Sequence, residues 1–217
     1  MQRFRPVIGI CGGIGSGKSA VSAALRELGC EVCHSDEVAR AVLERADVRA
    51  AVVARAGAHL ARPDGSIDRA ALGKAIFTDA ALRADIEKLM HPRIEAERRA
   101  QFARAPLSTR AFIIDAPLLL EVGLDRECDA VIFVDAPHEL RVQRVTGTRG
   151  WDAAELERRE RAQIPLGEKR ARSTDVVVND CEPEELGRRV GAVLGAIIAR
   201  GPARRAPSSE GPRTEPT

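Results

Sequence analysis

The chain has 217 residues, 44% of them apolar, which is sufficient for one domain with a buried core. Its 34 basic and 32 acidic residues give a net charge of +2, too balanced to favour a nucleic-acid or membrane partner. No apolar run approaches the ~20 residues that span a bilayer, and the apolar part of the N-terminus is too short for a signal peptide. Because the five cysteines are an odd number outside any small secreted framework, we expect a cytoplasmic protein.

Short apolar runs predict strands, several of them apolar at consecutive positions as in a parallel sheet buried on both faces. In chain order these strands are 7–11, 31–33, 111–115, 130–135 and 175–179. Helical spacing of apolar residues predicts helices over 17–28, 138–145 and 184–200. This alternation predicts an α/β fold, a five-stranded parallel sheet in a three-layer α/β/α core with right-handed crossovers.

Two intervals are too long for plain crossovers. Residues 36–106 are mostly helical, with a turn signal at Asp64-Gly65, and we interpret them as a helical substrate-binding insertion. Residues 148–173 are helical and rich in Arg and Glu, which suits a mobile lid, although an ordinary solvated helix also carries such pairs. Residues 201–217, with four prolines and no large apolar residue, are predicted to be a disordered tail. The nucleotide-binding core then comprises 1–35, 107–147 and 174–200.

The segment after the first predicted strand matches G-x-x-x-x-G-K-[ST], the phosphate-binding loop. Glycines let the backbone turn tightly, so that N–H groups and the N-terminus of the next helix face phosphate oxygens. Lys18 is placed to reach the β- and γ-phosphates, and the Ser19 hydroxyl to ligate Mg²⁺. A nucleoside triphosphate with Mg²⁺ is therefore the expected ligand. The residues expected to hold it are Gly12, Gly13, Ile14, Gly15, Ser16, Gly17, Lys18, Ser19 and Ala20.

A phosphate-binding loop alone does not separate kinases from GTPases and other ATPases. The chain has no N-K-x-D motif and is small for a motor ATPase, which favours a small kinase over a nucleotide-binding switch or a nucleic-acid-associated ATPase. A kinase needs a group that orients the acceptor hydroxyl and takes its proton. Asp36 is the candidate, because it follows the second strand at the edge where the loop lies. Alternatively, Ser35 or Asp36 only caps the helix that follows.

Further residues at strand ends and near the predicted lid are candidates for the same site. Asp115 ends an apolar strand, the Walker B pattern, and is the favoured Mg²⁺ ligand, with Asp135 as the alternative; each could instead be a cap or turn residue. Arg144 and Arg149 flank the hinge of the predicted lid, where guanidinium groups can stabilise phosphate charge. Asn179 follows the last strand, where a loop can read the adenine.

A set of longer segments, spread over nearly the whole chain except the tail, forms a further pattern. They are GICGGIGSGKS (9–19), HSDEVAR (34–40), DGSIDRAALGKAIF (64–77), MHPRI (90–94), IIDAPLLLEVGL (113–124), VIFVDAP (131–137), RVTGTRG (144–150) and EKRARSTDVVVND (168–180). Together they resemble the dephospho-coenzyme A kinase family. Segments 90–94 and 113–124 distinguish this family from other small kinases, which lack that pair of segments.

The resemblance implies ATP-dependent phosphorylation of the ribose 3′-hydroxyl of dephospho-coenzyme A, the last step of coenzyme A synthesis. Separately, we expect a monomer, with a weak oligomer as the alternative. The resemblance also implies that Asp36 is the catalytic aspartate. His91 and Arg93 lie in the predicted substrate domain, where we expect them to shape the substrate pocket, unless His91 only packs its helix. The chain has His34-Ser35-Asp36 where the family often has Asp-Ala-Asp, so no role of that first acid is carried over. It also has Ala20 where the family commonly has Thr. The alternative enzyme is another small P-loop kinase for a nucleoside, nucleotide or sugar acid.

Overall fold

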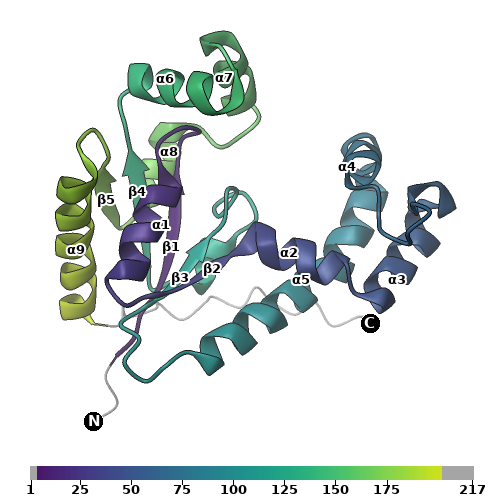
Figure 1. The fold of residues 1–217 in the computed structure, drawn as a ribbon, viewed down its shortest axis with the longest axis horizontal. Helices are drawn as coiled ribbons and strands as arrows, with labels where there is room; N and C mark the ends of the chain where they lie inside the picture. Colours follow the sequence, from purple (N-terminus) through teal and green to yellow (C-terminus); the bar gives the residue numbers. More distant parts are fainter. Residues whose placement is uncertain (1–3, 202–217) are drawn as a thin grey trace, which may run out of the picture.

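The described part of the chain, residues 4–201 of this computed structural model, forms a parallel sheet flanked by helices (Figure 1). The strands are β1 (Val7–Gly12), β2 (Glu31–His34), β3 (Phe112–Asp115), β4 (Ala130–Asp135) and β5 (Asp175–Val178). Their order is β2-β3-β1-β4-β5, and each neighbouring pair is parallel. The predicted strands are confirmed, with bounds that differ by at most one residue.

Helices connect the strands and form the rest of the fold. They are α1 (Lys18–Glu27), α2 (Ser35–Leu43), α3 (Ala46–Ala56), α4 (Arg69–Thr78), α5 (Ala80–Arg104), α6 (His138–Arg149), α7 (Ala153–Glu160), α8 (Leu166–Ala171) and α9 (Pro183–Arg200), with short 3₁₀ turns at Ala58–Leu60 and Leu124–Glu127. The predicted helices α1 and α9 are confirmed. Helix α6 runs beyond the predicted residue 145, because its turns continue until Gly150 adopts φ +67 and ends it.

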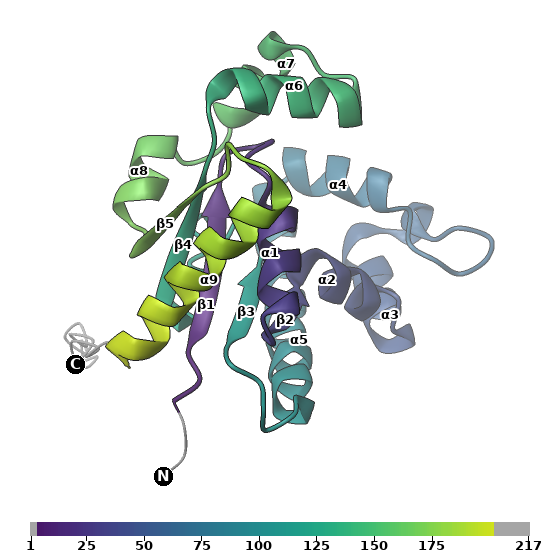
Figure 2. The ribbon, with the colours of Figure 1, turned by 60° about the vertical axis from the view of Figure 1, so that its left-hand side comes forward.

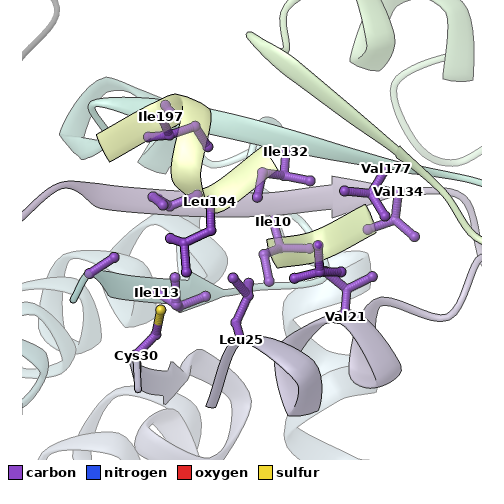
Figure 3. Close-up of a cluster of buried hydrophobic side chains, with 14 of the residues drawn as sticks. Ile10, Val21, Leu25, Cys30, Ile113, Ile132, Val134, Val177, Leu194 and Ile197 are labelled. Atoms are coloured by element: carbon purple, nitrogen blue, oxygen red, sulfur yellow. The ribbon is translucent and has the colours of Figure 1, made fainter. Parts of the chain in front are cut away.

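One face of the sheet packs against α1 and α9. Ile8 and Ile10 of β1 point to this face and are fully buried, whereas Cys11 points to the other. Figure 3 shows Ile10 on the same side of the sheet as Leu25 of α1 and Leu194 of α9. This layer is the larger of the two apolar clusters that cover the sheet, and it fixes α1, and with it the start of the helix after β1, against the strands.

The opposite face of the sheet is covered by the segment after β3 and by residues of the α8 region. Ile114 and Phe133 on this face contact a cluster that includes Leu119 and Leu120, with Leu166 of α8 packed against it. Because both faces are buried, the strands need apolar side chains at consecutive positions. This confirms the predicted three-layer α/β/α arrangement around a parallel sheet.

Helices α2 to α5 extend beyond the β2 edge of the sheet (Figures 1 and 2). They enclose an apolar cluster of their own, which includes Val48, Val52 and Leu60. The predicted turn is present, because Gly65 adopts φ +78 and its N–H donates to the Arg62 carbonyl at 2.9 Å. The long helix α5 returns from this cluster to the sheet.

The interval between β4 and β5 contains α6, α7 and α8. Helices α6 and α7 lie beyond the carboxyl ends of the strands, near the β1–α1 connection (Figures 1 and 2). The predicted tail, 201–217, lies outside the described residues apart from Gly201. Within residues 4–201, no helix has both the length and the apolar character needed to cross a membrane.

Candidate active site

The predicted phosphate-binding loop connects β1 to α1 at the carboxyl edge of the sheet. Gly15 and Gly17 have φ of +77 and +87, values that favour glycine strongly. A Cβ on Gly17 would also lie 2.0 Å from Nδ2 of Asn179, so a side chain there would collide with a buried neighbour. Within the described residues, the buried hydroxyl of Ser16 has no hydrogen-bond partner. The loop therefore has the wrapped backbone that a phosphate group requires.

Lys18 is folded over the loop in this structure. Its Nζ donates to the carbonyls of Gly12 and Gly13, at 3.2 and 3.0 Å. Burial, followed by the nearby Lys169 ammonium, lowers the pKa of Lys18 from 10.5 to about 8, and Asp115 opposes this shift. An incoming anion would relieve both the desolvation and the like-charge repulsion.

Arg144 and Asn179 hydrogen-bond to backbone carbonyls of the loop and hold it in place. Nη1 of Arg144 donates to the Gly15 and Ser16 carbonyls, at 3.4 and 3.3 Å, and its Nη2 donates to Oδ1 of Asn179 at 3.3 Å. Asn179 is buried, and its Nδ2 donates to the Ser16 carbonyl at 2.8 Å. Their polar groups thus satisfy loop carbonyls. The direct roles predicted for them, with phosphate and with adenine, stay predictions.

The tip of the loop is clamped by a pair that sequence analysis missed. Glu160 at the end of α7 accepts the Ile14 N–H at 3.1 Å and pairs with Nη1 of Arg141 at 2.5 Å. The same Arg141 nitrogen donates to the Ile14 carbonyl at 3.3 Å. Nothing in the spacing of these residues signals the pair, because their contacts with the loop span 127 and 146 positions.

A cavity of about 670 Å³ opens in front of the loop. Among the predicted site residues, Ile14, Gly15, Lys18, Ser19, Asp36, Asp115 and Arg149 line it. Trp151 and Arg159 also line it and were not predicted. The Arg149 and Arg159 guanidinium carbons lie 4.8 and 4.0 Å from the Trp151 ring centroid, which gathers cationic groups at the cavity wall. The chain's single Trp, two positions after Arg149 in the sequence, was the available signal.

The two aspartates considered as metal ligands differ in position. Asp115 lines the cavity with Ser19, whereas Asp135 pairs with Arg170 of α8. Oδ2 of Asp115 accepts a hydrogen bond from the Ser22 hydroxyl at 2.8 Å. A carboxylate and a hydroxyl beside the loop fit Mg²⁺, which prefers oxygen ligands and binds jointly with nucleotide phosphates. Within the described residues, no three His, Cys, Asp or Glu side chains cluster as a metal site.

Asp36 lies where this cavity meets a second one of about 630 Å³. The second cavity lies between the start of α2, helix α5 and the segment after β3, and His91 lines it, whereas Arg93 is not among its lining residues. Ser35 also lines it, and no described residue hydrogen-bonds to its buried hydroxyl. The capping alternative is wrong: His34 is the N-cap residue of α2, and Asp36, which is exposed, lies in the first turn.

A phosphate-binding loop at the carboxyl edge of a parallel sheet, with an acid between two cavities, is typical of a P-loop kinase. The sequence profile of the family described as Dephospho-CoA kinase matches residues 6–185. The chain belongs to the dephospho-CoA kinase family.

Individual relatives agree with this. The dephospho-CoA kinase of Anaeromyxobacter dehalogenans is 39% identical over 205 residues, which cover 94% of this chain and 97% of that protein. The dephospho-CoA kinase of Geobacter sulfurreducens is 40% identical over 188 residues, 85% of this chain and 94% of that protein. A crystal structure from Thermus thermophilus superposes with a TM-score of 0.78 at 34% identity, covering 89% of this chain and 98% of that one. The predicted family is confirmed.

Proposed function

We propose that the protein transfers the γ-phosphoryl group of ATP to the ribose 3′-hydroxyl of dephospho-coenzyme A, forming coenzyme A and ADP. The observation that carries this proposal, beside family membership, is the position of Asp36 at the junction of the two cavities. A nucleotide seated on the loop places its terminal phosphate toward that junction, and an acceptor in the second cavity reaches it from the other side. Neighbouring groups in the second cavity, the Ser35 hydroxyl and His91, offer polar contacts to the acceptor.

In this mechanism each residue has one task. The backbone amides of 13–19 and Lys18 bind the phosphates, and Ser19 and Asp115 would hold Mg²⁺, which when bound neutralises phosphate charge. Asp36 orients the 3′-hydroxyl and accepts its proton as the oxygen bonds to the γ-phosphorus and ADP leaves. Arg149 stabilises the charge on the transferring group. Arg144 and Asn179 contribute to the site indirectly, because they hold the loop through hydrogen bonds to the Ser16 carbonyl.

We also propose the division into a core, a helical substrate domain over 36–106 and a lid over 148–173. The separate apolar cluster of α2–α5 supports the substrate domain. The position of α7, with Arg159 on the cavity wall, supports a lid that closes and excludes water. We further propose a cytoplasmic protein that is a monomer or a weak oligomer. The near-neutral charge supports the proposal that it binds neither nucleic acid nor membrane.

Formation of ADP from ATP, measured with dephospho-coenzyme A, adenosine, AMP and gluconate as acceptors, tests the proposal. We expect turnover with dephospho-coenzyme A and none with the others, because only the first fills the second cavity with its pantetheine arm. Turnover only on another acceptor would replace this substrate with that of another small kinase. ATP hydrolysis stimulated by nucleic acid, without any acceptor turnover, would instead favour a nucleic-acid-associated ATPase.

The lowered pKa of Lys18 predicts that ATP binding takes up protons. With a pKa of about 8, roughly half of the Lys18 side chains are neutral at pH 8, and bound phosphates favour the ammonium form. We expect uptake of about half a proton at pH 8, little at pH 6.5, and an ATP affinity that falls as the pH rises above 8. Folding stability without ligand has the opposite pH dependence to ATP affinity. Between pH 8 and 10.5 the unfolded chain binds more protons than the folded chain, so the free energy of unfolding rises with pH over that window.

Isothermal titration calorimetry in two buffers of different ionisation enthalpy measures this proton uptake. The Lys18→Met variant is the control, since it has no ammonium to form. Identical binding heats in both buffers at pH 8 would contradict the prediction.

A further inference from the structure

His34 connects two elements of the candidate site. It is the last residue of β2, and Asp115 is its register partner at the end of the adjacent strand β3. Its ring Nδ1 lies 3.1 Å from Oδ2 of Asp115, and its Nε2 lies 2.9 Å from Nη2 of Arg26 on α1. The His34 side chain is 27% exposed and that of Asp115 is 13% exposed, so the contact is largely shielded from water. Both residues line the phosphate cavity.

The partner of Nε2 determines which ring nitrogen carries the hydrogen. A guanidinium group only donates hydrogen bonds, so Nε2 of His34 accepts from Arg26. Nδ1 then carries the N–H and donates it to Oδ2 of Asp115. The Ser22 hydroxyl donates to the same oxygen at 2.8 Å. Oδ2 therefore has two donors among the described residues, whereas Oδ1 has none there.

We propose that His34 is a positioning residue, which holds the Asp115 carboxylate so that Oδ1 faces the cation that accompanies the nucleotide. The order of contacts is Arg26 to His34 to Asp115, with the guanidinium fixing the ring orientation from α1. A hydrogen bond of this kind to a ligating carboxylate restricts its rotation and keeps it ready for the metal. The proposal rests on the part of the proposed function that assigns Asp115 to Mg²⁺, and it does not depend on the identity of the acceptor.

Two amide variants separate the Nδ1 contact from the rest of the ring. In His34→Asn the amide nitrogen takes the place of Nδ1 and can still donate to Asp115. In His34→Gln the amide group reaches the place of Nε2 instead, where its oxygen can accept from Arg26, so the bond to Asp115 is lost while a polar side chain remains. His34→Ala removes both contacts.

The probe is Mn²⁺ in the presence of ADP, with binding followed by electron paramagnetic resonance. We expect His34→Gln and His34→Ala to weaken Mn²⁺ binding by about 10-fold or more, as is typical for loss of a hydrogen bond to a metal-ligating group. His34→Asn keeps affinity close to that of the native chain. Because Asp115 mediates the effect, His34→Ala causes no further loss in a chain that already carries Asp115→Asn. Thermal melting ensures that each variant is measured while folded.

Three results would overturn the proposal. They are native Mn²⁺ affinity in His34→Ala and His34→Gln, a loss in His34→Asn as large as in His34→Ala, or additive losses in the double variant. Failure of the substrate proposal is distinguishable from these, because Mn²⁺ and ADP bind without any acceptor. A chain that phosphorylates no dephospho-coenzyme A can still show the expected order of Mn²⁺ affinities.

Discussion

The Asp36→Asn variant is expected to transfer phosphate to dephospho-coenzyme A at least about 10²-fold more slowly than the native chain, as expected for a missing general base. The amide keeps the size of the side chain but cannot accept the proton of the 3′-hydroxyl. Asp36 is exposed and lies in the first turn of α2 without being its cap, so the fold should be unaffected. Initial rates of ADP formation, together with the KM for both substrates, measure the effect. We expect the loss in kcat, because the carboxylate acts in the transition state.

Glu44→Gln is the matched control for this experiment. Glu44 lies at the other end of the same helix, is exposed, and is absent from the residues that line either cavity. It removes the same charge without touching the site, so we expect native kinetics. A native rate in Asp36→Asn would remove Asp36 from catalysis and leave the family assignment standing.

The largest effect on stability is expected at a buried ion pair, where Lys169→Met and Glu121→Met should each destabilise the fold by about 3–5 kcal/mol. Nζ of Lys169 lies 2.7 Å from Oε1 of Glu121, and the Lys169 side chain is only 1% exposed. The same Nζ donates to Gln163 at 2.9 Å, and Oε1 of Glu121 accepts the Ile164 N–H at 3.3 Å. Either single change leaves the other charge buried without its partner, which explains the size of the expected loss.

The Glu121→Met/Lys169→Met double variant tests that reason. We expect it to recover most of the lost stability, because both buried charges are then removed and side chains of similar length fill the space. Chemical denaturation followed by circular dichroism gives the unfolding free energies. Glu87→Gln, in an exposed pair with Arg83 at 3.8 Å, is the control and should change stability by less than about 1 kcal/mol. If the double variant is as unstable as the single variants, the loss of stability comes from lost packing and not from an unpaired buried charge.

Local sequence was sufficient for the strands, for helices α1 and α9 and for the phosphate loop. The strands bury both faces, so their apolar runs are continuous and easily located, and the loop motif depends on glycines at fixed spacing, such as Gly15 and Gly17 with positive φ. The position of Asp36 at the loop edge also follows from a general property of parallel sheets. The strands and the loop depend on residues that are near one another in the chain, which explains why spacing alone predicted them.

Only the tertiary structure decided how the distant segments meet. The order β2-β3-β1-β4-β5 makes His34 and Asp115 neighbours although they are 81 positions apart. Contacts across 129 and 163 positions turn Arg144 and Asn179 toward the loop backbone rather than the cavity. Arg144 donates to loop carbonyls, whereas Arg149 is exposed. This difference depends on packing over all three layers, so residue type and spacing cannot distinguish the two arginines. Sequence therefore determined the loop and the strand-end acids, whereas the fold added Arg141, Glu160 and Trp151 and determined the direction in which each side chain acts.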